Sequence, residues 1–221
     1  MYNEIIIAGF GGQGVLLAGT LIAQAAIEQG LHTTWFPSYG AEMRGGTANS
    51  TVVVSADEIG SPLAFNPNAL IALNEPSLNK FMPRMTEKSV IIANSSIISQ
   101  DKEYKVKPYF VPVTDIADKE IKNVRTANLV AVGALIKALE IFADANCEDE
   151  PAQKRRQSAD EEGDLCDLEA SKVLTLKSAL TACEKAFASK PELIEINKKA
   201  IQAGYEYIKA EVQKFGSSEV R

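Results

Sequence analysis

A glycine-rich turn between two apolar segments constrains the fold of this chain most strongly. Residues 9–14 (GFGGQG) follow the short apolar run 5–8 and precede a long apolar stretch, residues 15–27. A short apolar run predicts a buried strand, and the longer one predicts a helix. Glycines allow a tight turn, and the free N–H groups at the start of the helix favour a bound anion. The sequence therefore predicts a strand, a turn suited to phosphate, and a helix.

The turn has the GxGxxG spacing of a dinucleotide-binding motif. Such motifs bind NAD or FAD when an acidic residue after the second strand holds the ribose hydroxyls. The second strand expected here ends in Pro37 and Ser38, and the first carboxylate after it is Glu42, several residues further on. The missing acidic residue argues against NAD or FAD. A tight turn without a ligand, a site for a phosphate-bearing ligand, and contact with a partner's cofactor remain open.

Strands and helices alternate along the rest of the chain. This order predicts an α/β fold, a three-layer Rossmann-like sandwich with a mainly parallel sheet. We expect residues 1–221 to form a single domain with an acidic loop insertion at about 144–172, and the last helix to pack on the sheet or on a partner subunit. The expected strands are residues 5–8, 33–36, 49–55, 70–73, 90–93 and 109–112, and the expected helices are 13–29, 77–85, 126–142, 174–188 and 191–214.

Three loops of this sheet are candidates for a ligand site. Ligands of parallel sheets bind at the carboxyl ends of the strands. The glycine turn, residues 38–46 and residues 74–76 are expected to meet at that edge. Arg44 is the cation best suited to an anion there, because its planar donors are followed by two glycines. An ion pair of Arg44 with Glu42 or Glu75 is the alternative interpretation.

Two long motifs, taken together, resemble one protein family. They are residues 9–15 (GFGGQGV) and 37–46 (PSYGAEMRGG), and the similarity continues through 59–62, 70–78, 123–133 and 203–205. The chain resembles the gamma subunit of 2-oxoacid:ferredoxin oxidoreductases, the pyruvate/ketoisovalerate oxidoreductase gamma family. The second motif is more similar to the 2-oxoglutarate and branched-chain 2-oxoacid members than to the pyruvate members. The acidic segment near position 160 departs from the family pattern, in which this connection is shorter.

The resemblance implies a subunit of an enzyme complex that has no catalytic residue of its own. In that family, companion alpha and beta subunits, with or without a ferredoxin-like delta subunit, carry thiamine diphosphate, magnesium and iron–sulfur clusters. A 2-oxo acid is decarboxylated, ferredoxin receives the electrons indirectly through the clusters, and the acyl group passes to coenzyme A. The alternatives are an independent nucleotide-binding domain, a purely structural assembly subunit, and a subunit of an indolepyruvate oxidoreductase.

The resemblance and the residues together suggest a coenzyme A site in this chain. The pyrophosphate and ribose phosphate of coenzyme A need N–H donors and a cation rather than an acidic ribose ligand. The expected cradle consists of Gly11, Gly12, Gln13 and Gly14, closed by Ser38, Tyr39 and Arg44.

We expect neither a metal site nor a catalytic nucleophile in this chain. Its three cysteines, Cys147, Cys166 and Cys183, do not cluster, whereas an iron–sulfur cluster needs four thiolates. Cys183 falls on the apolar stripe of a predicted helix and is expected in the core. The single histidine, His32, is expected at the surface or in a cap. No metal site and no thiamine-binding motif are recognised.

The negative charge of the chain is local. Residues 144–172 contain ten acidic and four basic residues, which accounts for the formal net charge of −6, because the other 19 acidic and 19 basic residues balance. We expect a solvated loop, or alternatively an acidic docking surface. No basic stripe suggests nucleic acid. No bilayer-length apolar run and no secretory signal are expected, so the sequence predicts a cytoplasmic protein without a membrane segment.

Overall fold

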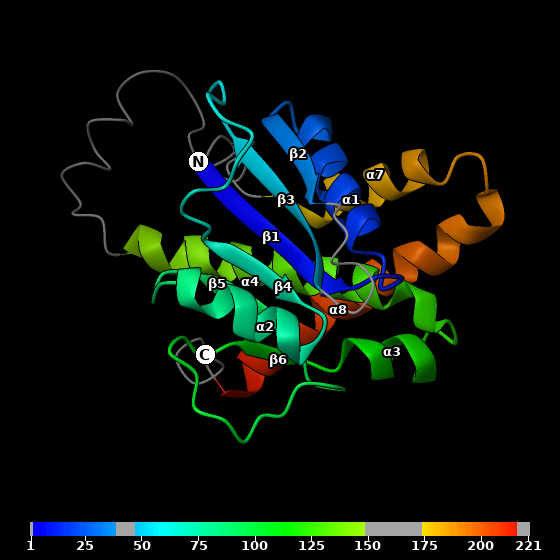
Figure 1. Ribbon diagram of the computed structural model, residues 1–221. Helices are drawn as coiled ribbons and strands as arrows, with labels where there is room; N and C mark the ends of the chain where they lie inside the picture. Colours follow the sequence, from blue (N-terminus) through cyan, green and yellow to red (C-terminus); the bar gives the residue numbers. More distant parts are fainter. Residues whose placement is uncertain (1, 39–46, 149–173, 216–221) are drawn as a thin grey trace.

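A six-stranded sheet forms the centre of the protein (Figure 1). The computed structural model describes residues 2–38, 47–148 and 174–215, with the side chains of 145–148 and 215 left aside. The strands are β1 (Tyr2–Phe10), β2 (His32–Ser38), β3 (Thr47–Ser55), β4 (Ala69–Ala72), β5 (Val90–Asn94) and β6 (Tyr109–Val111). Their order is β2-β3-β1-β4-β5-β6. The pairs β1–β4, β4–β5 and β5–β6 are parallel, so the mainly parallel α/β sheet is confirmed.

Strand β3 runs antiparallel to both of its neighbours, β1 and β2. Only residues 39–46 connect β2 to β3. A parallel pair would need a crossover of about a dozen residues or more, so this short connection requires a hairpin. Ser38 pairs with Asn49, and Thr47 pairs with Phe10 at the end of β1. The connection therefore leaves the sheet at the edge strand β2 and rejoins it beside the glycine turn.

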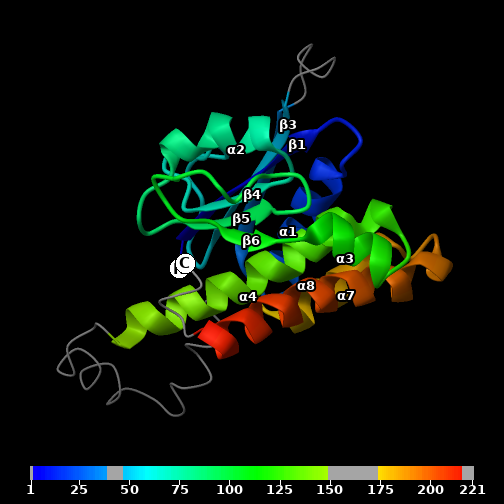
Figure 2. The ribbon, with the colours of Figure 1, turned by 90° about the horizontal axis from the view of Figure 1, so that it is seen from below.

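Helices cover the two faces of the sheet unequally (Figure 2). Helices α1, α3, α4, α7 and α8 pack on one side, whereas α2, the 3₁₀ turn η2 and the segment that follows β5 cover part of the other. The helices are α1 (Val15–Glu28), α2 (Glu75–Phe81), α3 (Val113–Lys119), α4 (Ala127–Glu148), α7 (Leu176–Ala186) and α8 (Ile194–Phe215), and the 3₁₀ turns are η2 (Met82–Arg84), η3 (Val124–Thr126) and η5 (Pro191–Leu193).

The five predicted helices all form, with changed boundaries, and α3 was not predicted. Helix α3 has seven residues, too few to show a helical period in the sequence. Helix α2 begins two residues before the prediction, because the Asn74 side chain accepts a hydrogen bond from the Ser77 N–H at 2.9 Å and caps it. Its predicted last turn is the 3₁₀ turn η2, which contains Pro83. Local capping and proline therefore decided these boundaries.

Helix α4 is the most apolar long helix among the described residues. The stretch Val124–Asp144 is long and apolar enough, by length and composition alone, to cross a membrane, which corrects the expectation that no such run exists. In the fold, 67% of an 18-residue window within this stretch is buried. It packs between the sheet and α8 (Figure 2), so its apolar composition is that of a core helix.

Helix α8 packs mainly on α4, and it also contacts the sheet at β6, so the expected packing on the sheet is a smaller part of its interface. Glycines allow this close approach: a Cβ at Gly133 would collide with the carbonyl oxygen of Ile201, and one at Gly204 with that of Val130. The Tyr205 hydroxyl donates to Glu140 at 2.7 Å across the same interface. The backbones of the two helices therefore nearly touch at these glycines.

Two predictions about single residues are confirmed. Cys183 is fully buried in the core formed by α7 and α8. Burial raises the pKa of its thiol from about 9.0 to about 11. His32 is exposed at the first position of β2. Cys147 and Cys166, like most of the acidic segment, lie outside the part whose side chains the structure describes.

Candidate functional site

Gln13 joins the glycine turn to the end of β4. Its Oε1 accepts hydrogen bonds from the Phe10 N–H at 2.6 Å and from the Asn74 Nδ2 at 3.0 Å. Its Nε2 lies 3.5 Å from the carbonyl oxygen of Leu73. Two of the three loops expected at the carboxyl edge of the sheet are therefore in direct contact, and Gln13 holds them in place.

The glycines of the turn have different structural roles. A Cβ at Gly9 would lie 2.7 Å from Gln13 Oε1, and one at Gly14 would lie 2.5 Å from Asn128 Nδ2, so these two glycines are needed for packing. Gly12 has a φ of +92°, and a Cβ there would meet no atom within 4 Å. Gly11 and Gly12 are both exposed. The open part of the glycine turn, residues 9–14, is thus its middle rather than its ends.

A cavity of about 300 Å³ opens beside this turn. The strand order reverses between β1 and β4, since α1 leaves β1 towards one face and α2 leaves β4 towards the other. Such a switch point is where open α/β sheets bind ligands, and the volume is at the lower end for small-molecule sites. The lining residues come from the ends of β4 and β5, the glycine turn and the starts of α3 and α4: Gly12, Gln13, Leu73, Asn94, Ile97, Thr114, Val124, Arg125 and Ala127.

Asn94 orders the wall of the cavity on the β5 side. Its Nδ2 donates to the carbonyl oxygen of Leu73 at 3.2 Å and to the Thr114 Oγ1 at 2.9 Å, and its Oδ1 accepts from the Ser96 N–H at 3.2 Å. Asn94 is only 2% exposed. Because its amide is fully engaged, Asn94 positions its neighbours, while the Thr114 hydroxyl proton has no acceptor within the described part of the chain.

Arg125 is the cation of this cavity, and sequence reasoning missed it. It lies in η3, where the Asn123 side chain accepts a hydrogen bond from the Arg125 backbone N–H at 3.1 Å. The Arg125 guanidinium has no hydrogen-bond or ion-pair partner in residues 2–38, 47–148 and 174–215. An asparagine cap just before a predicted helix was the available signal, since it places the next residues at a helix start.

The sequence-predicted site residues are only partly described. Gly12 and Gln13 line the cavity, and Ser38 is exposed at the end of β2. Tyr39 and Arg44 lie outside the described residues, as does Glu42. Glu75, one candidate ion-pair partner of Arg44, pairs with Lys102.

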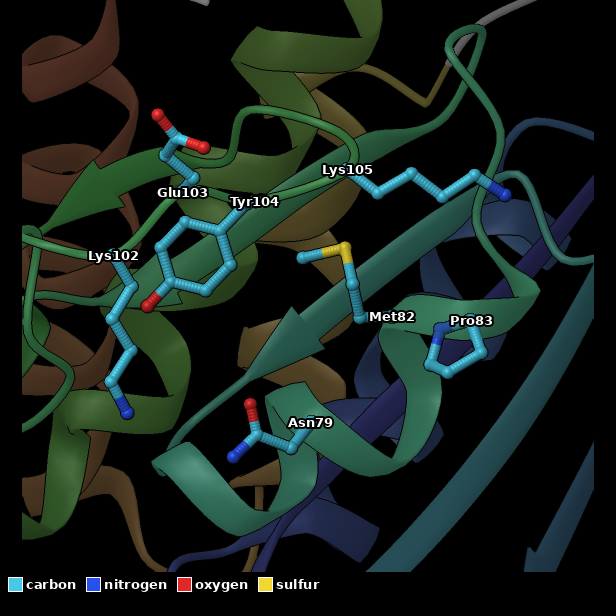
Figure 3. Close-up of a pocket in the computed structure, with 7 residues that line it drawn as sticks. All are labelled: Asn79, Met82, Pro83, Lys102, Glu103, Tyr104 and Lys105. Carbon is cyan, nitrogen blue, oxygen red and sulfur yellow. The ribbon is translucent and has the colours of Figure 1, made fainter.

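A second cavity, of about 430 Å³, lies between α2, η2 and the segment after β5 (Figure 3). Lys102 and Lys105 stand on opposite sides of Tyr104 in this view. The Tyr104 hydroxyl donates to the carbonyl oxygen of Ser99 at 2.8 Å, and Lys102 pairs with Glu75. Since Tyr104 and Lys102 already have partners and no glycine turn approaches, the cavity beside Gly12 is the candidate site.

Among the residues with described positions, no group of three or more His, Cys, Asp or Glu side chains is arranged to hold a metal ion. Among the described lining residues, the polar groups of the candidate site are neutral amides, a hydroxyl, a glycine backbone and one guanidinium. Such groups bind and orient an anion.

Comparisons with known proteins all point to one group. Residues 4–161 match the family model for pyruvate ferredoxin/flavodoxin oxidoreductase. The chain is 33% identical over 210 residues to the ketoisovalerate oxidoreductase subunit VorA of Methanothermobacter marburgensis, covering 95% of this chain and 37% of VorA. It is 36% identical over 151 residues to the 2-oxoglutarate synthase subunit KorC of Methanocaldococcus jannaschii, covering 67% of this chain and 81% of KorC.

A solved structure shares the whole fold. The keto/oxoacid ferredoxin oxidoreductase gamma subunit of Geobacter sulfurreducens superposes with a TM-score of 0.68 at 26% identity, over 94% of this chain and 99% of that one. The present chain spans little more than a third of the length of the VorA relatives it matches, 37% in each. The matched region is therefore a whole chain in some relatives and one part of a longer chain in others.

Proposed function

The chain belongs to the pyruvate ferredoxin/flavodoxin oxidoreductase family, and on this premise we propose that it is the gamma subunit of a 2-oxoacid:ferredoxin oxidoreductase. The complex would decarboxylate a 2-oxo acid oxidatively to an acyl-coenzyme A. The names of the relatives favour 2-oxoglutarate or a branched-chain 2-oxo acid, since ketoisovalerate is of the latter kind. The match along nearly the whole chain carries the proposal.

The role of this chain in the complex is binding rather than bond breaking. We assign thiamine diphosphate, magnesium and the iron–sulfur clusters to alpha and beta partner subunits, with or without a ferredoxin-like delta subunit, and the electrons to ferredoxin. The candidate site supports this division, because its described groups are amides, one hydroxyl and one guanidinium, none suited to act as a general base near neutral pH. A cytoplasmic location is part of the same proposal.

Coenzyme A is the ligand proposed for the carboxyl edge of the sheet, where it would accept the acyl group. Gly11, Gly12, Gln13 and Gly14 would form its cradle, with Ser38, Tyr39 and Arg44 closing it. The described part of the site fits such an anion: the Gly12 backbone is open, and Gln13 holds the turn rigidly against β4. The loop that carries Tyr39 and Arg44 ends beside this turn, where Thr47 pairs with Phe10.

Purification of the tagged chain from its native host under anaerobic conditions tests the assembly. We expect subunits that bear thiamine diphosphate and iron–sulfur clusters to be recovered with it, identified by mass spectrometry, and the eluate to show brown iron–sulfur absorbance. The recovered complex is then assayed with 2-oxoglutarate and branched-chain 2-oxo acids. A colourless protein that is purified alone would reject the proposal.

In the assembled enzyme, an Arg44→Ala variant with unchanged apparent affinity for coenzyme A would reject the role of Arg44.

A further inference from the structure

An uncharged surface lies at one end of the sheet, where helix α1 and strand β2 pack side by side (Figure 1). With histidine counted as neutral, residues 15–38 contain one charged residue, Glu28, although 24% of the whole chain is charged. Glu28 is already paired, since its Oε2 lies 2.6 Å from the Nζ of Lys185 on α7. The exposed parts of α1 and β2 therefore present no unpaired charge, in contrast to an ordinary solvated surface.

The exposed residues of α1 form one stripe. Leu17, Thr20 and Ile27 are the exposed positions of this helix, and Gln24 lies between Thr20 and Ile27 in the same row. Leu17 is 36% exposed and Ile27 is 54% exposed. Spacings of three and four residues place these side chains on one side of the helix, opposite the side that packs on the sheet. A surface helix normally carries charged residues there, so this stripe is suited to contact another apolar surface.

Strand β2 is the last strand of the sheet, and its outer edge is uncharged. Among the residues that the structure describes, no strand pairs with that edge. Trp35 and Phe36 point to opposite faces of the strand and are 39% and 46% exposed. Natural edge strands are usually protected by charged side chains or proline, and β2 carries only Pro37, near its end. The outer backbone groups of β2 are therefore available to pair with another strand.

We propose that β2 pairs antiparallel with β2 of a second copy of this chain, so that the two sheets continue into one. A two-fold axis perpendicular to the sheet makes the same surface of both copies meet, and it leaves both α1 helices beside each other on one face. This single contact covers the edge strand together with the stripe Leu17, Thr20 and Ile27. An extended peptide from a different protein would cover β2 but leave the stripe exposed, so the second copy is favoured.

The register and the charge of β2 both fit pairing with itself. Pro37 has no N–H to donate, so pairing centred on Thr34 keeps it at the end of the ladder. Thr33 then lies opposite Trp35 of the second copy, and both side chains point to the face that α1 covers. The two copies do not repel each other through this surface, because the formal net charge of −6 comes from residues 144–172.

Light scattering of the full chain after size-exclusion chromatography, over a series of concentrations, tests the proposal. We expect wild type to reach twice the 23.9 kDa mass of one chain. Phe36→Lys puts a lysine into the edge strand of both copies, and Ile27→Glu puts a carboxylate into both stripes. Each should therefore raise the dissociation constant of the dimer at least about 100-fold.

Two substitutions of the same kind elsewhere are the matched controls. Phe65→Lys and Leu63→Glu change apolar residues that are 66% and 45% exposed, in the segment 56–68 that reaches η2. Both should leave the dissociation constant unchanged. Circular dichroism and urea denaturation verify that each variant folds. Hydrogen exchange of the wild-type chain needs no variant, and we expect peptides from residues 15–38 to exchange more slowly at high than at low protein concentration.

The contrary results are distinct. Wild type that keeps the mass of one chain at millimolar concentration would overturn the proposal, as would a folded Phe36→Lys or Ile27→Glu variant with the wild-type dissociation constant. Exchange of residues 15–38 that does not depend on concentration would overturn it as well. A monomeric wild type whose partner subunits are lost with Phe36→Lys would assign the surface to a different protein.

The proposal goes beyond the proposed function and does not depend on it. A colourless dimer that is purified without other subunits would reject the oxidoreductase assignment and support the contact through β2. A brown complex with one copy of this chain would support the assignment and overturn the contact.

Discussion

The side-chain amide of Asn128 donates to the carbonyl oxygen of Gly14 at 3.0 Å, which ties the first turn of α4 to the turn that precedes α1. The two residues are 114 positions apart in the chain. Asn128 is 1% exposed and fills the space that a Cβ at Gly14 would take. The shape of the glycine turn therefore depends on a residue from the middle of the chain, and the candidate cavity lies between these two elements.

Replacing Asn128 should loosen this connection. Asn128→Ala removes a buried hydrogen bond, and we expect the free energy of unfolding to fall by about 1–2 kcal/mol in urea denaturation. Asn128→Asp has the same shape but buries a carboxylate without the donor, so its loss should be larger and should diminish in acid, where the carboxyl group is neutral. Equal stability of Asn128→Asp and wild type at pH 7 would contradict the contact.

The crossing of α4 and α8 should not tolerate any side chain at its two glycines. Gly133→Ala and Gly204→Ala each place a Cβ against a carbonyl oxygen of the facing helix, so we expect a loss of at least about 2–3 kcal/mol in the free energy of unfolding. Gly60→Ala is the matched control, because a Cβ there meets no atom within 4 Å, and it should change stability by less than about 0.5 kcal/mol. Similar denaturation midpoints for all three variants would show that α4 and α8 are further apart than in this structure.

Cys183 should make stability depend on pH in the alkaline range. Burial raises the pKa of its thiol to about 11, so the unfolded chain loses the thiol proton at lower pH than the folded one does. The free energy of unfolding should therefore decrease as the pH rises from about 9 to about 11. A Cys183→Ala variant, compared at each pH by chemical denaturation, should lack this part of the decrease. If the free energy of unfolding fell equally with pH in wild type and Cys183→Ala, the raised pKa of the Cys183 thiol would be contradicted.

The single tryptophan reports on the packing of α1 against the hairpin. A Cβ at Gly19 would lie 2.7 Å from Trp35 Nε1 and 2.5 Å from Ser50 Oγ, while Trp35 is 39% exposed. Gly19→Ala should displace the indole towards solvent and shift its fluorescence emission to longer wavelength. Gly60→Ala serves as the control and should leave the emission maximum in place. An unshifted emission spectrum for Gly19→Ala would mean that helix α1, rather than the Trp35 indole, moves to make room for the new Cβ.

Much of the fold was predictable because its signals are local. The apolar run at residues 5–8 gave a strand, the stretch after the glycine turn gave α1, and the alternation of such segments predicted the α/β sheet. The meeting of Gln13 and Asn74 followed from the rule that ligand loops gather at the carboxyl ends of parallel strands. Helix α3 escaped prediction because seven residues hold too little periodicity.

The sequence by itself determined most of the elements, their order and the glycine turn, since these depend on residues close together in the chain. Only the tertiary structure decided that Arg125 faces the same cavity as Gly12, that Asn128 packs on Gly14, and that α8 lies on α4. These contacts join residues far apart in the chain, and their geometry depends on how the sheet and helices pack. Packing of that kind leaves no short-range pattern in the sequence, so the position of Arg125 beside Gly12 became visible only in the folded protein.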